Sequence, residues 1–177
     1  MVDPTRHRQL EELNMAELCT RILSNARNEL YLNMRYLDVA LGSLGYEADP
    51  ECRGVGTDGF VIYYNPDFLC GLFRQGRVWV NRCYLHMVLH CLFCHMDTRG
   101  RREERLWNLA CDIAAESVID GLYLGCIHRQ PSLYRQDWYG RLRKELQVLN
   151  AEGVYHVLKG IKLQDGQRDR LAEEFYV

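Results

Sequence analysis

Two histidines four residues apart, His86 and His90, are the side chains in this 177-residue sequence that most clearly point to chemistry. Residues four apart lie on one face of an α-helix, so both imidazoles can present a nitrogen atom to the same point. This H-x-x-x-H spacing supplies half of a tetrahedral zinc site, which needs a further protein ligand. The alternative is a pair of core histidines with ordinary hydrogen bonds. Metal binding is favoured because the surrounding segment is mostly apolar, and unpaired polar groups are costly there.

A carboxylate that can complete the site follows 22 residues after His90, at Asp112, and Glu116 lies one helical turn beyond it. Two packed antiparallel helices would bring these carboxylates to the histidines. One carboxylate would then bind the metal, and the other would orient a ligand imidazole without binding the metal itself. The alternative is a solvated helix face, but the flanking residues are small or apolar: Ala110, Cys111, Ile113, Ala114 and Ala115.

His95 is a competing ligand, five residues after His90. On an ideal helix the two would be separated by about 140° around the axis. His95 can therefore join the site only if the helix ends or unwinds between them, and we rank it below Asp112.

Eight cysteines stand out in the composition. Cys91, Cys94 and His95 match the C-x-x-C-H pattern of haem attachment, but that modification normally requires export. The first residues of the sequence have no apolar segment of the signal-peptide type, so we expect a cytoplasmic protein. The same two cysteines could form half of a structural zinc site, but there is no second C-x-x-C. We interpret all eight as reduced thiols, mainly in packing.

Length and charge narrow the class of protein. The chain has 22 Lys and Arg against 24 Asp and Glu, and 47% of its residues are hydrophobic. This predicts one globular domain over residues 1–177, and it argues against a protein that coats nucleic acid or an anionic membrane. The longest apolar stretch, 78–96, is interrupted by Asn81, Arg82 and three histidines, which is typical of a buried helix rather than a membrane span.

These residues must be positioned by a mostly helical framework. Apolar spacing predicts helix over 5–44, with a break near Ser24 and Asn25, and then over 67–74, 78–95, 103–120, 141–149, 151–159 and 167–176. A strand is predicted at 60–64, with one or two more around 46–53 and 122–127; otherwise 42–59 is loop and 121–140 is mostly irregular. The predicted class is α+β, mostly helical, with a small β-sheet or β-hairpin.

With both helices in view, the chain resembles a bacterial family of zincin-like zinc metallopeptidase domains that are commonly followed by a von Willebrand factor A-like domain. The resemblance covers about residues 20–125, and 126–177 would be a helical C-terminal part. It rests on Thr57-Asp58-Gly59, on Tyr63-Tyr64-Asn65-Pro66, on the histidine helix and on Leu106-Trp107-Asn108-Leu109-Ala110-Cys111-Asp112.

The resemblance implies zinc as the cofactor, with His86, His90 and Asp112 as its ligands. It implies that the strand at 60–64 is an edge strand along which an extended substrate pairs, through Val61, Ile62 and Tyr63. As partners it implies a protein or peptide, an A-like domain and a MoxR-type ATPase.

One departure from the family concerns catalysis. The family helix reads H-E-x-x-H, whereas this sequence has Met87 at the second position. That glutamate is the general base that takes a proton from the attacking water, and a thioether cannot accept it. General-base catalysis is worth about 10²–10⁴-fold, so we expect impaired peptidase activity and a role as a binding or scaffold module.

Two other functions stay open at this stage. One is an active metal-dependent hydrolase in which Glu116 or another carboxylate replaces the missing base. The other is a structural helical domain without metal. Separately, the aromatic residues Tyr134, Trp138 and Tyr139 form either a partner site or packing under a loop.

Overall fold

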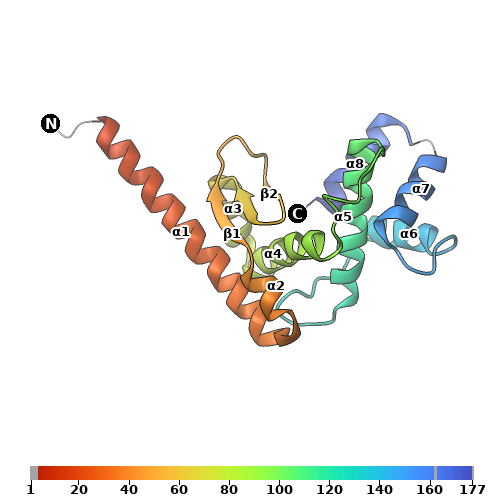
Figure 1. Ribbon diagram of the computed structural model, residues 1–177, viewed down its shortest axis with the longest axis horizontal. Coiled ribbons are helices and arrows are strands. Elements are labelled where there is room, and N and C mark those ends of the chain that lie inside the picture. Colours follow the sequence, from red (N-terminus) through yellow and green to blue (C-terminus); the bar gives the residue numbers. More distant parts are fainter. Residues whose placement is uncertain (1–3, 162, 177) are drawn as a thin grey trace. The chain divides into compact units, whose positions relative to one another are not determined.

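The computed structural model describes residues 4–161 and 163–176 and divides the chain into two compact units, Met1–Met87 and Val88–Val177 (Figure 1). Among the described residues there are eight α-helices, one short 3-10 helix and a three-stranded sheet. This confirms the mostly helical α+β class. That residues 1–177 form a single domain stays a prediction.

The first unit is built on the long helix α1 (Pro4–Asn33), followed by a 3-10 turn, η1 (Arg35–Leu37), and by α2 (Asp38–Gly42). The predicted break at Ser24 and Asn25 is wrong, because α1 is continuous and the helix is first interrupted at Met34. Asn25 is exposed, and buried apolar residues on either side of the pair pack one face of the helix: Cys19, Ile22, Leu23, Ala26 and Leu30. Packing of this face outweighs the weak helix propensity of the two residues.

The small sheet has the strand order β1-β3-β2 (Figure 1), with β1 (Gly45–Ala48) parallel and β2 (Val55–Thr57) antiparallel to β3 (Val61–Tyr64). The strand predicted at 60–64 is therefore present, but the prediction that it is an edge strand is wrong. Ile62 and Tyr63 have partners on both sides, so their backbone groups are not available to an added substrate strand. β1 overlaps the segment 46–53, where a further strand was predicted. β2 lies in the segment predicted as loop, and 122–127 forms no strand.

Asp58 and Gly59 of the family motif build the turn that leads into β3. The Asp58 carboxylate accepts hydrogen bonds from the backbone N–H groups of Phe60 and Val61 and from the Tyr63 hydroxyl. These hydrogen bonds, the backbone ones above all, lower the pKa of the Asp58 carboxyl group below its usual value. Gly59 has a φ of +98°, which side-chain-bearing residues rarely adopt. This part of the motif is thus explained by local structure.

Two helices complete the first unit. Asn65 caps α3 (Pro66–Gln75) by accepting hydrogen bonds from the backbone of Asp67 and Phe68. The next helix, α4 (Arg77–Leu92), begins in the first unit and continues without interruption past Met87. Both helices lie where the sequence predicted them, within three residues at each end.

The second unit is organised around α5 (Glu104–Gly121), which packs against α7 (Ala151–Ile161) and α8 (Asp165–Phe175). The helix predicted at 141–149 is wrong: α6 (Leu133–Leu142) lies earlier, in the segment predicted as mostly irregular. Ser132 caps it, and Trp138, Tyr139 and Leu142 bury one face in the core of this unit. Tyr134 packs against the same core, so the packing interpretation of these aromatic residues is confirmed.

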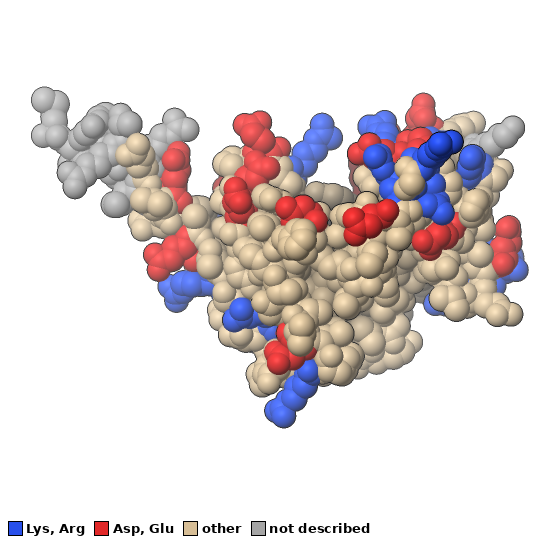
Figure 2. Space-filling model, viewed as in Figure 1, with Lys and Arg blue, Asp and Glu red and all other residues tan. Residues whose placement is uncertain are grey.

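The surface is mixed in charge. On the face drawn in Figure 2, basic and acidic side chains are interspersed rather than separated by sign. In the described part of the chain, no helix combines the length and apolar character needed to span a membrane.

Candidate metal centre

Helix α4 presents His86 and His90 one turn apart on one face. The helix is buried continuously from Val80 to Leu89, and the polar residues Asn81, Arg82 and His86 are buried together with its apolar ones. The His86 side chain is only 2% exposed, whereas His90 is half-buried. The two imidazoles therefore lie at the boundary between the core and a partly open site.

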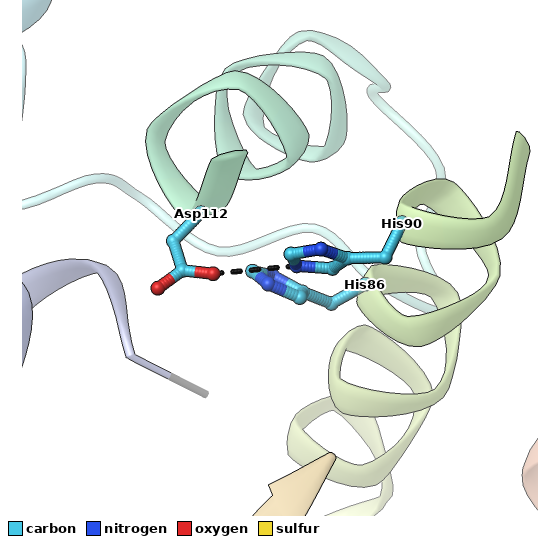
Figure 3. Close-up of side chains that lie close together, drawn as sticks. All are labelled: His86, His90 and Asp112. Carbon is cyan, nitrogen blue, oxygen red and sulfur yellow. Dashed lines mark ion pairs between the residues drawn. The ribbon is translucent and has the colours of Figure 1, made fainter. Parts of the chain in front are cut away.

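Helix α5 supplies the third member of the cluster. Glu103 caps the helix by accepting hydrogen bonds from the backbone of Arg105 and Leu106, and buried residues on both sides of Asp112 anchor it in the core. Asp112 itself is half-buried, and its Oδ1 lies 3.3 Å from His90 Nε2. In Figure 3 the three side chains point toward one another, the histidines from α4 and the aspartate from α5.

The geometry of this cluster suits a metal ion. One ligand atom from each of His86, His90 and Asp112 lies within 4.8 Å of the others. Ligands held tetrahedrally at about 2.0–2.1 Å from zinc are about 3.3 Å apart, which is the His90–Asp112 separation observed here. Two neutral imidazoles and one carboxylate are a common donor set for such an ion. Small side-chain rotations would bring the third donor to the same spacing.

His95 is next to the cluster, but on the other side of His90. Helix α4 ends at Leu92, which is the condition under which the sequence allowed His95 to approach. Its Nδ1 then lies 3.2 Å from the Nδ1 of His90, whereas the Nε2 of His90 faces Asp112. His95 therefore contacts the ring nitrogen of His90 that faces away from the cluster, and His95 is not one of the three clustered residues.

Glu116 is buried, with 1% of its surface exposed, and is not a member of the three-residue cluster. Its carboxylate accepts a 2.6 Å hydrogen bond from Arg135, a residue of α6. Burial alone would lower the pKa of the Arg135 guanidinium, but the neighbouring carboxylates of Glu116 and Asp120 raise it above its ordinary value. The partner of Glu116 is therefore Arg135, which the sequence did not predict.

The remaining predicted features are accounted for by packing. Met87 is 6% exposed and sits between the two histidines in the chain. None of the eight cysteines forms a disulfide in the structure, which agrees with their interpretation as reduced thiols. Cys111, next to Asp112, is buried, and this burial raises the pKa of its thiol well above the ordinary value. Cys111 belongs to the hydrophobic core of the second unit and not to the three-residue cluster.

A histidine pair on one buried helix, faced by an aspartate from the next helix, forms a candidate metal site on a mostly helical α+β fold. A family model described as "Putative metallopeptidase domain" matches residues 19–175, and the chain belongs to this family. The match extends the resemblance found in the sequence from about 20–125 to nearly the whole chain. Comparisons with curated proteins and with solved structures gave no significant match.

Proposed function

We propose that this domain binds zinc through His86, His90 and Asp112 but lacks the general base of an active peptidase, and that it acts by binding a protein or peptide. The observation that carries the proposal is the convergence of three candidate ligand side chains, two on α4 and one on α5, to within 4.8 Å of one another. Membership of a metallopeptidase-like family supports the same site.

Each residue has a defined part in this proposal. His86 and His90 provide neutral imidazole nitrogens, and Asp112 provides a negatively charged oxygen that offsets part of the metal's charge. When bound, zinc in such a site polarises carbonyl groups as a Lewis acid and acidifies water. Met87 occupies the position of the base and has no group that accepts a proton.

The hydrolase alternative that relies on Glu116 is not favoured. Its buried carboxylate is held by Arg135, and moving it to act as a base would break a buried, charge-assisted hydrogen bond. The metal-free structural alternative is distinguished from our proposal by the experiment below. A cytoplasmic location and partnership with an A-like domain and a MoxR-type ATPase are further proposals, and they rest on the family resemblance.

The test is elemental analysis of the gently purified protein. We expect about one zinc per chain in the unaltered protein and a large loss of zinc in His86→Ala, because two remaining ligands hold zinc weakly. His156→Ala is the matched control, because His156 is exposed on α7 and lies outside the cluster. It should keep its zinc. An unaltered protein that contains no metal and takes up none on addition of zinc would overturn the proposal.

A further inference from the structure

The two ring nitrogens of His90 face different partners. Nε2 lies 3.3 Å from Asp112, in the cluster, and Nδ1 lies 3.2 Å from Nδ1 of His95. The His90 and His95 rings meet edge to face, with a 4.9 Å centroid separation and an 84° interplanar angle. A neutral imidazole that offers Nε2 to a metal carries its proton on Nδ1. That proton then points at His95, whose Nδ1 accepts it in a hydrogen bond.

The end of helix α4 holds His95 in this place. The backbone N–H of His95 donates to the carbonyl of His90 at 3.0 Å, and that of Cys94 donates to the carbonyl of Cys91 at 3.1 Å. Cys94 has a φ of +53°. This pair of hydrogen bonds around a left-handed residue is a Schellman motif, which reverses the chain at a helix end. The same residue, His90, thus anchors the backbone of His95 and contacts its ring.

Helix α5 fixes His95 from a second direction. The indole Nε1 of Trp107 donates to the His95 carbonyl oxygen at 3.0 Å, and the two rings also meet edge to face. Trp107 is 1% exposed, and the guanidinium group of Arg102 covers its ring at 4.7 Å. His95 is itself 5% exposed. A polar ring that is this well buried and held by two elements has little freedom to turn away from His90.

We propose that His95 is a positioning residue that holds His90 in the tautomer and orientation in which Nε2 is free to bind the metal. The inference rests on the proposed metal site and adds a role for a residue that does not itself bind the ion. Hydrogen-bond partners behind a ligand histidine typically change metal affinity by about 10–100-fold. The contact between the two Nδ1 atoms is present in the metal-free protein, where Nε2 of His90 faces the Asp112 carboxylate. The direction of this hydrogen bond is defined once Nε2 binds the ion, because the proton of His90 must then lie on Nδ1.

The experiment compares three variants with the unaltered protein. His95→Leu removes the acceptor and keeps an apolar side chain of similar reach. His95→Asn retains an acceptor, because its Oδ1 is as many bonds from Cα as the Nδ1 of histidine. His156→Leu is the control for replacing a histidine elsewhere in the same unit. Zinc affinity is measured by competition with a chromogenic chelator, and the tautomer of His90 by nitrogen-15 NMR of the zinc-loaded protein.

We expect His95→Leu to bind zinc about 10–100-fold more weakly and to show mixed His90 tautomers, whereas His95→Asn and His156→Leu stay close to the unaltered protein. Equal affinity in His95→Leu and the unaltered protein would overturn the inference, as would a His90 that binds zinc through Nδ1 in the unaltered protein. If the unaltered protein binds no zinc, the proposed function fails. NMR of the metal-free protein then still decides whether the Nδ1 atoms of His90 and His95 share a hydrogen bond. Unfolding in the presence of chelator identifies any variant that does not fold.

Discussion

At the scale of single residues, position 87 separates metal binding from catalysis. The histidines on either side of it belong to the candidate metal cluster, while the side chain between them is a buried thioether. Binding needs only the ligand nitrogens and oxygen, whereas peptide hydrolysis by this family of sites also needs a proton acceptor beside the attacking water. We therefore propose that this single side chain makes the domain a binding module rather than an enzyme.

Met87→Glu tests this separation directly. We expect it to hydrolyse an unfolded protein substrate about 10²–10⁴-fold faster than Met87→Gln, because glutamine has nearly the same shape and no basic group. Initial rates at matched zinc content provide the measurement, and a chelator should abolish the gain. If Met87→Glu holds zinc and is no faster than Met87→Gln, more than the base is missing from the site.

At the scale of elements, a buried ionic network ties three helices of the second unit together. Arg135 of α6 is 8% exposed and contacts Glu116 and Asp120 of α5 at 2.6 and 3.2 Å. It also bonds the backbone carbonyl of Glu174 in α8, and its guanidinium group lies over the Phe175 ring. Asp120 further accepts a hydrogen bond from the Tyr139 hydroxyl. Because α5 also carries Asp112, this network supports the helix that completes the metal cluster.

Arg135→Met should destabilise the protein strongly. Removing one partner leaves buried carboxylates without their counter-charge, which typically costs about 3–5 kcal/mol of unfolding free energy. Arg141→Met, on the same helix, is the matched control because its ion pair with Asp137 is exposed, and it should cost no more than about 0.5 kcal/mol. Urea denaturation followed by circular dichroism measures both. Equal stability of the two variants would show that the network contributes little.

At the scale of the whole molecule, metal binding and stability should be linked. The three ligand atoms converge only when α4 and α5 are folded, so an unfolded chain offers no comparable site. Any ligand that binds only the folded state stabilises it by mass action. Zinc content therefore reports on the fold as well as on the site.

Zinc at about 100 times its dissociation constant should raise the free energy of unfolding by about 2.7 kcal/mol. His90→Ala should show no such increase, and His156→Ala, which alters an exposed residue of α7 outside the cluster, should show the same increase as the unaltered protein. Calorimetry with and without chelator provides the measurement. It also tests the single-domain prediction, since one domain should unfold in a single transition with equal calorimetric and van't Hoff enthalpies. An unchanged transition at saturating zinc would contradict the linkage.

Much of this site followed from local pattern. The four-residue spacing placed His86 and His90 on one helix face, and the apolar flanks of Asp112 predicted that its helix packs in the core; the structure brings all three together.

The position of α6 was missed because Trp138, Tyr139 and Leu142 lie in a segment whose turn-forming residues masked the helical spacing. The central place of β3 was missed because its neighbours are only three and four residues long, too short to give a recognisable alternation.

The residue types of the candidate ligands, the spacing of the histidines on one helix and the absence of a glutamate at position 87 could all be read from the sequence. They depend only on residue identity and helical periodicity. Only the tertiary structure shows which carboxylate faces the histidines and which ring nitrogen of His90 faces that carboxylate. Asp112 and Glu116 are one turn apart on the same helix, yet one meets His90 and the other meets Arg135. That choice depends on the packing of neighbouring helices, and the place of His95 depends on a left-handed residue at a helix end.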